Sequence, residues 1–163
     1  MIHRLILCLL AILLPTDAFA MSRGLDLDSA LRDADLIARI KVISVAQAPS
    51  DSGYKQLAQA TVTESIKGLK AGTVIELLSD NGFTCPNVLY QANDDCIIFA
   101  RRTPKGHFET MNTYAGQFRI RDGLVVDFYL LPAYDSAYDS TRKAAKPETI
   151  IALLRRRFSN LTK

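Results

Sequence analysis

Few residues of this chain have the types and spacing that catalysis requires. Ser79, His107 and Asp80 could in principle form a nucleophilic triad, but nothing in their spacing places them together. Cys85 precedes Pro86 and has no basic neighbour that would favour its reactive thiolate form. We therefore predict no catalytic residues, and we expect that the protein is not an enzyme.

The first twenty residues have the composition of a secretory signal peptide. Met1–Arg4 is a short basic start, Leu5–Leu14 is an apolar run, and Ala18–Ala20 supplies the small residues of a cleavage site. We predict cleavage after Ala20, which gives a periplasmic or secreted protein with no stable membrane span after cleavage. The alternative is that this segment is retained as a membrane anchor. The expected organisation is a signal peptide, 1–20, and a single domain, 21–163.

Removal of the signal peptide would also remove His3 and Cys8, and would leave one histidine and two cysteines. In an oxidising compartment two cysteines most often pair, so Cys85 and Cys96 are our candidate disulfide. The alternative is two free, buried thiols. A lone histidine cannot form a multi-histidine metal site, and bridged cysteines could not supply thiolate ligands to zinc.

The remaining polar motifs are better explained by turns than by ligands. Asp94-Asp95 could bind a cation, but a solvated turn before a buried strand is the more common arrangement. Lys67-Gly68 and Ala71-Gly72 carry isolated turn glycines, and no glycine-rich phosphate loop is present. We therefore predict no metal site and no cofactor.

The charge balance is mild, with a formal net charge of +3. The densest basic cluster is Arg155-Arg156-Arg157, which we place at the C-terminus of a helix, where cations complement the helix dipole. No row of aromatic residues is interleaved with cations, as the face of a nucleic-acid-binding barrel requires. We therefore expect no nucleic acid partner.

The mature chain is predicted to be mainly β, with helices only at its ends. The first helix is expected over 25–34, capped by Asp26 or Asp28, and the last over about 147–158, with Pro147 at its start. Apolar residues at helical spacing in the last helix predict that it packs on the barrel. The sequence predicts strands at 36–45, 56–66, 73–78, 96–100, 107–111, 118–120 and 124–130. The Ala-Tyr-Asp-Ser repeat at 133–140 is expected to be a loop.

Two of these strands have informative patterns. Residues 36–45 alternate between apolar and polar side chains, which is typical of a half-buried strand. Cys96-Ile97-Ile98-Phe99-Ala100 is apolar on both faces, which predicts a central strand buried on both sides. Arg121-Asp122-Gly123 is a hairpin signal between the last two strands.

The order of several of these segments resembles the netrin-like domains related to the tissue inhibitors of metalloproteinases, above all their short bacterial exported relatives. The segments are Ala34–Val45, Ala60–Gly68, Gly72–Leu77, Cys85, Asp95–Ala100 and Tyr114–Gly116. The resemblance covers about 34–120 and implies an OB-fold, a small closed Greek-key barrel. In bacterial relatives the loop cysteine pairs with a later cysteine, where this chain has Tyr114.

The resemblance does not transfer the inhibitors' functional residues. In those proteins a cysteine at the mature N-terminus chelates the protease zinc, whereas cleavage here would expose Met21-Ser22-Arg23-Gly24. We therefore expect an exported, non-enzymatic OB-fold module that binds a protein or a cell-envelope component. Its contacts would fall on the barrel face and its loops, including Asn81 to Asn87. Metalloprotease inhibition is the alternative function, and an uncharacterised hydrolase that uses His107 is a second alternative.

Overall fold

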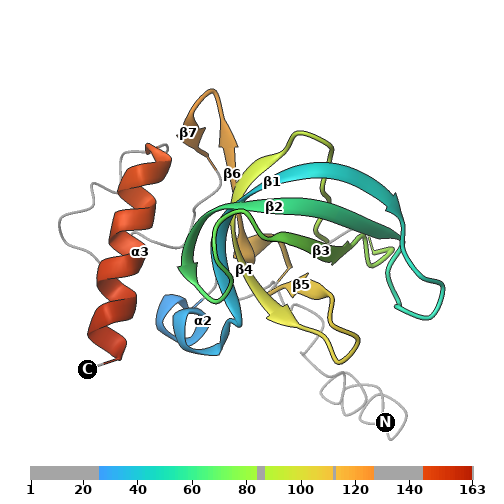
Figure 1. Ribbon diagram of the computed structural model, residues 1–163, viewed down its shortest axis with the longest axis horizontal. Coiled ribbons are helices and arrows are strands. Elements are labelled where there is room, and N and C mark those ends of the chain that lie inside the picture. Colours follow the sequence, from blue (N-terminus) through green and yellow to red (C-terminus); the bar gives the residue numbers. More distant parts are fainter. Residues whose placement is uncertain (1–25, 84–86, 112, 127–144, 163) are drawn as a thin grey trace, which may run out of the picture.

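The computed structural model describes residues 26–83, 87–111, 113–126 and 145–162. These residues form seven strands, two α-helices and a short 3₁₀-helix (Figure 1). In chain order the elements are α2 (Leu27–Asp33), β1 (Leu36–Gln47), β2 (Gln56–Lys67), β3 (Val74–Ser79), β4 (Asp95–Arg102), β5 (Phe108–Thr110), η2 (Thr113–Gly116), β6 (Gln117–Arg121), β7 (Leu124–Val125) and α3 (Pro147–Leu161). The strands predicted from the sequence are confirmed, except that 127–130 lies outside the described residues.

The first five strands close into a barrel. The sheet runs in the order β1-β2-β3-β5-β4, and β4 pairs in turn with β1, so that no edge remains between these two strands. The closing pair is antiparallel from Leu36 opposite Ala100 to Lys41 opposite Asp95. β3 and β5 form a short parallel pair, with Leu77 opposite Phe108. This is the OB-fold-like Greek-key barrel that the sequence predicted.

The barrel encloses one hydrophobic core. Alternate residues of β1, including Leu36, Ala38 and Ile40, point inward and are fully buried. β4 is buried on both faces, as its sequence predicted. Its even-numbered residues Cys96, Ile98 and Ala100 belong to this inner core, which also contains Ala58, Ala60, Val62, Ile75, Leu77, Val88, Tyr90 and Phe108.

A second core lies between the outside of the barrel and the two helices. From β4, Ile97 and Phe99 point outward into this core, and Phe99 makes an edge-to-face contact with Phe118 of β6. The buried stripe of α3 includes Ile150 and Leu154, so the predicted packing of this helix on the barrel is confirmed. The short helix α2 adds Leu27, Ala30 and Leu31.

The two helices begin in different ways. The Asp26 side chain caps α2 by accepting a hydrogen bond from the Asp28 backbone N–H at 3.3 Å, as predicted. In α3, Pro147 occupies the first turn, where its missing N–H costs no helical hydrogen bond. Lys146, at the N-cap of α3, makes no capping hydrogen bond.

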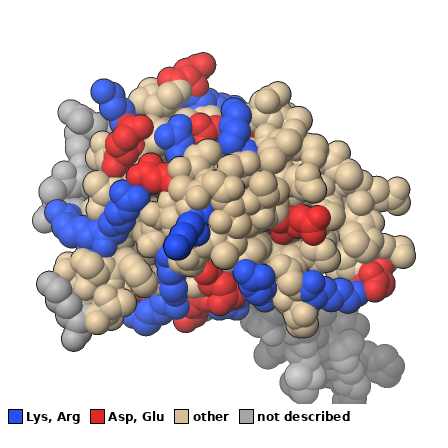
Figure 2. Space-filling model, in the orientation of Figure 1, with Lys and Arg blue, Asp and Glu red and all other residues tan. Residues whose placement is uncertain are grey.

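The predicted role of the arginine cluster at the helix C-terminus is wrong. The helix α3 continues to Leu161, and its last turn contains no basic residue. Arg155 instead pairs with Glu64 of β2 at 3.0 Å, and Arg157 pairs with Asp28 of α2 at 2.8 Å. These arginines therefore attach α3 to its neighbours. Figure 2 shows most of the visible charged side chains toward the α3 side of the molecule.

Several predictions fall on residues that the structure does not describe. These are the signal peptide, Cys85 and the Ala-Tyr-Asp-Ser repeat. Over the described ranges, no helix is long and apolar enough to cross a membrane. The 3₁₀-helix η2 at Thr113–Gly116, which connects β5 to β6, was not predicted from the sequence.

Candidate functional site

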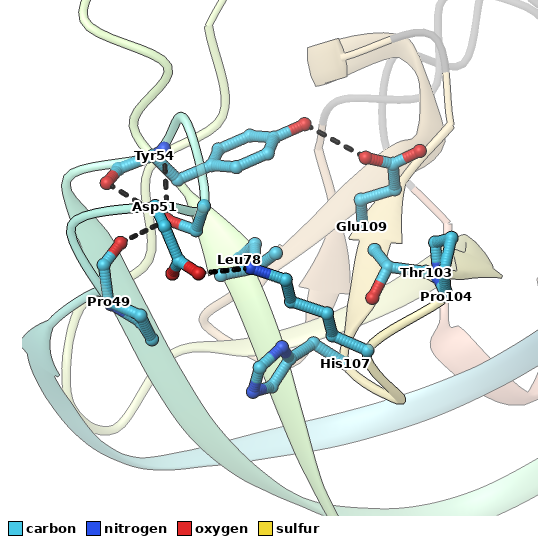
Figure 3. Close-up of a pocket in the computed structure, with 10 residues that line it drawn as sticks. Pro49, Asp51, Tyr54, Leu78, Thr103, Pro104, His107 and Glu109 are labelled. Atoms are coloured by element: carbon cyan, nitrogen blue, oxygen red, sulfur yellow. Dashed lines mark hydrogen bonds and ion pairs between the residues drawn. The ribbon is translucent and has the colours of Figure 1, made fainter.

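The candidate site is a cavity of about 280 Å³ at one end of the barrel, between two loops (Figure 3). One loop, residues 48–55, joins β1 to β2, and the other, residues 103–107, joins β4 to β5. β3 and β5 form the floor between them. The lining residues are Pro49, Asp51, Ser52, Tyr54, Leu78, Thr103, Pro104, Lys105, His107 and Glu109.

The β1–β2 loop is held in shape by its own polar groups. The Ser52 hydroxyl donates to the Pro49 carbonyl at 2.7 Å and accepts from the Tyr54 N–H at 3.1 Å. At the base of the loop the Ala48 N–H donates to the Lys55 carbonyl at 3.0 Å. These bonds fix Tyr54 at the edge of the cavity, so a turn-forming sequence becomes one wall of the site.

The β4–β5 loop is a tight hairpin connection. The Thr103 N–H donates to the His107 carbonyl at 2.8 Å, and the Gly106 N–H donates to the Thr103 carbonyl at 3.0 Å. Gly106 has a φ of 91°, which the turn requires. Pro104 and Lys105 therefore project from the tip of the hairpin, while Thr103 and His107 lie at its base.

Polar contacts connect the two loops across the cavity. The ammonium group of Lys105 forms an ion pair with Asp51 of the opposite loop. The Tyr54 hydroxyl donates to the Glu109 carboxylate at 3.0 Å, which links the β1–β2 loop to β5. Figure 3 shows Tyr54 and Asp51 on one side of the cavity and Glu109 on the other.

His107 lies beside a carboxylate of the floor. Its Nε2 is 3.3 Å from a carboxylate oxygen of Glu76 in β3, so this nitrogen carries the hydrogen that Glu76 accepts. The other ring nitrogen, Nδ1, is buried without a hydrogen-bond partner. The hydroxyl of Thr103 is also buried and unpartnered. Unsatisfied buried polar atoms are uncommon in native proteins, and two of them lie at this site.

The ionisation of the site favours binding over nucleophilic chemistry. Burial, followed by the bond to Glu109, raises the pKa of Tyr54 to about 12, so its hydroxyl remains a hydrogen-bond donor at neutral pH. Lys105 lowers the pKa of Asp51, which therefore remains a carboxylate. The Ser52 hydroxyl is bonded to backbone atoms of its own loop rather than to His107.

The structure describes only one end of the candidate disulfide. Cys96 is a free thiol buried in the inner core, and burial raises its pKa to about 12. Cys85 lies outside the described residues. The pairing of Cys85 with Cys96 therefore stays a prediction.

The structure does not bring Ser79, His107 and Asp80 together. The Ser79 hydroxyl lies 3.5 Å from the Gln56 side chain, whereas the Asp80 carboxylate accepts from the Asn87 amide at 3.0 Å. Since His107 faces Glu76 instead, these three residues do not form a triad. Ser79 and His107 contact side chains of the neighbouring strands β2 and β3, and Asp80 supports the turn that follows β3.

The other polar motifs have structural partners. Asp95 forms a bidentate ion pair with Arg39, with the closer atoms 2.7 Å apart. Asp94 accepts from the Gln91 N–H at 2.8 Å, as expected for a turn before a core strand. Where the chain is described, no group of three or more His, Cys, Asp and Glu side chains could hold a metal ion.

The loop from Asn81 to Asn87, which we predicted to contact a partner, is closed at its base. The Asn87 side chain accepts from the Asn81 N–H at 3.0 Å and from the Val88 N–H at 2.9 Å. Asn87 therefore supports the loop, and the intervening 84–86 lie outside the described residues.

Sequence reasoning singled out His107 but missed its neighbours. Tyr54 and Glu109 are 55 positions apart, and Asp51 and Lys105 are 54 apart, so no local motif reveals either pair. The predicted OB-fold was the one available signal, because its β1–β2 and β4–β5 loops commonly flank the ligand site. Comparison with known proteins adds no further signal: no protein-family model matches the chain, and no curated protein is significantly similar to it.

Proposed function

We propose that this protein is an exported, non-enzymatic OB-fold module that binds a protein partner of the cell envelope in the cavity between its two loops. The proposed export rests on the signal-peptide sequence. The observation that supports the binding site is the position of the cavity, between the β1–β2 and β4–β5 loops of a closed barrel. Loops held by a rigid scaffold are common binding sites, and OB-folds commonly use this pair.

The lining of the cavity supports a binding role. Apolar surface comes from Tyr54, Leu78, Pro49 and Pro104, and polar or charged groups lie at defined positions beside it, on Asp51, Ser52, Thr103, Lys105, His107 and Glu109. Ligand sites typically combine mostly apolar walls with a small number of placed polar groups.

The same residues argue against catalysis. A nucleophile needs a base within hydrogen-bond reach. Among the described residues of the cavity, the Ser52 hydroxyl is bonded to a backbone carbonyl, the Tyr54 hydroxyl is bonded to Glu109, and the His107 imidazole faces Glu76.

The resemblance to netrin-like domains stays a proposal, because many unrelated proteins share the OB-fold.

Filling the cavity tests this function. Pro104 is exposed on the hairpin tip, so Pro104→Trp should occupy the cavity without disturbing a core. Ala71→Trp places the same side chain on the exposed β2–β3 turn and is the matched control. The protein is immobilised and exposed to envelope extract, and captured proteins are quantified by mass spectrometry.

We expect one partner to be captured equally by the wild-type protein and by Ala71→Trp, and at least tenfold less by Pro104→Trp. Circular dichroism checks that all three proteins are folded. Equal capture by the two tryptophan variants would show that the cavity is not the binding site.

A further inference from the structure

We propose that the cavity receives a basic side chain, Lys or Arg, of the partner protein. This inference rests on the proposed function and adds the chemistry of the group that is recognised. It is drawn from three features of the site: its unpaired carboxylate, the lysine that already occupies one of its acceptors, and its apolar walls.

The first feature is an excess of carboxylates. Lys105 is the one Lys or Arg among the described residues that line the cavity, and Asp51 neutralises it. Glu109 receives only the neutral hydroxyl of Tyr54 at 3.0 Å, and none of the described Lys and Arg side chains forms an ion pair with it. A carboxylate with a free oxygen in a partly buried site is a strong acceptor for a charged donor.

The second feature is the Lys105 ammonium group itself. It forms an ion pair with Asp51 of the opposite loop. The side chains of Lys105 and Asp51 are 56% and 71% exposed, so their pairing is weak and can be exchanged for another cation. The chain thus already binds an alkylammonium group at Asp51, one of the two carboxylates that line the cavity.

The third feature is the apolar surface beside these acceptors. The Tyr54 ring and Leu78 lie next to the carboxylates, and the two prolines lie at the rim. Lys and Arg side chains pack their methylene stems on such a surface while the charged end reaches a polar partner. A cation close to the face of Tyr54 would gain a further electrostatic contribution.

Other ligands fit these features less well. An anionic ligand would meet the Glu109 carboxylate and would have to compete with Asp51 for Lys105. A saccharide could stack on Tyr54, but its binding would not depend on the charge of Glu109. The test therefore separates these classes by changing charge at constant size.

The probes are blocked pentapeptides, acetyl-Gly-Ser-Xaa-Ser-Gly-amide, in which Xaa is Arg, Lys, norleucine or Glu. Binding is followed by NMR of isotope-labelled protein, purified after expression of the full chain, from the resonances of Tyr54, Leu78 and Glu109. We expect the Arg and Lys peptides to shift these resonances in a saturable manner. The norleucine and Glu peptides should bind at least tenfold more weakly.

Three variants test the roles of the charged groups. Glu109→Gln should weaken binding of the Arg and Lys peptides at least fivefold. Lys105→Met removes the internal competitor and should strengthen it severalfold, whereas Lys70→Met, on an exposed turn away from the cavity, should leave it unchanged. Asp51→Asn, at an exposed position, should also weaken binding and provides a second carboxylate variant if Glu109→Gln does not fold.

Equal binding of the norleucine and Lys peptides, or weaker binding of basic peptides by Lys105→Met, would overturn the inference. A second contrary result would be that the basic peptides fail to bind while chitobiose binds saturably, with equal affinity for the wild type and Glu109→Gln. That result would indicate a glycan site. Failure of this inference about a basic side chain would not by itself contradict the proposed binding function. If Pro104→Trp abolishes partner capture but Glu109→Gln does not, the cavity binds the partner by another chemistry.

Discussion

The substitution Gly68→Ala should be among the most destabilising single-methyl additions in this domain. Gly68 follows β2 and has a φ of 91°, a conformation that residues with a Cβ rarely adopt. A Cβ at this position would lie 2.4 Å from the backbone oxygen of Asp35. Asp35 cannot withdraw easily, because its N–H donates to the Ala100 carbonyl at 2.9 Å and its side chain accepts from the Arg102 N–H at 2.8 Å. The clash therefore falls where β1 and β4 begin to close the barrel.

Gly72 provides the control that separates the cost of the left-handed conformation from the cost of the contact with Asp35. Its φ is 86°, nearly that of Gly68, but a Cβ there would meet nothing within 4 Å. We expect Gly72→Ala to cost about 1–2 kcal/mol, the usual price of a left-handed conformation for a residue with a Cβ. Gly68→Ala should cost a further ~1–3 kcal/mol for the enforced contact. A domain of this size has a free energy of unfolding of about 5–15 kcal/mol, so the second change is severe.

Urea unfolding followed by circular dichroism measures both free energies of unfolding directly. In thermal melts each kcal/mol should lower Tm by about 3–5 °C. We expect the two single variants to share the conformational cost and to differ by the contact with Asp35. Equal destabilisation by Gly68→Ala and Gly72→Ala would refute the reasoning, since it would mean that the chain relieves the contact at no cost.

Three further predictions concern the helices and the buried thiol. Arg157 lowers the pKa of Asp28, so their pairing should add about 0.5–1 kcal/mol to the free energy of unfolding above pH 4, and this contribution should be lost as the pH falls further. The variant Arg157→Gln should therefore flatten the acid limb of a stability–pH curve. An unchanged acid limb would contradict this. Lys146→Ser should add the missing N-cap of α3 and raise the free energy of unfolding by ~1 kcal/mol in urea titrations, whereas no gain would show that the helix start is already satisfied. The thiol of Cys96 should resist iodoacetamide at pH 8 in the folded protein, because it is buried and its pKa is about 12, and rapid labelling would contradict this burial. Labelling of unfolded, unreduced protein also tests the predicted pairing with Cys85, because two alkylated thiols would exclude the disulfide.

The barrel could be predicted because its strands carry their burial pattern locally. In β1 the alternation of Leu36, Ala38 and Ile40 with Arg39 and Lys41 indicates the inward face, whereas Ile37 is buried on the other face, in the second core. In β4 the uninterrupted apolar run predicted burial on both sides, and the structure explains it by two separate cores. The role predicted for Arg155 and Arg157 was wrong because the sequence does not distinguish two cases. A basic cluster near the end of a helix can complement the helix dipole or can pair with another element.

The candidate site could not be predicted in the same way, because its partners come from distant parts of the chain. Lys105 and Asp51 each lie in a turn whose sequence indicates only a turn, and their pairing depends on how the closed barrel places one loop beside the other. Glu109 lies on a strand of only three residues, where periodicity carries little information. Long-range polar contacts of this kind follow from the topology rather than from local propensity.

The positions of the second core and the cavity suggest how the domain can separate stability from binding. The helices α2 and α3 cover one side of the barrel, and the two loops of the cavity lie away from them (Figure 1). Ion pairs such as Arg39 with Asp95 and Arg155 with Glu64 strengthen the helix side, whereas the loops contribute mainly exposed side chains. Substitutions at Lys105 should therefore change binding with little effect on unfolding, because the scaffold that positions the loop is stabilised elsewhere.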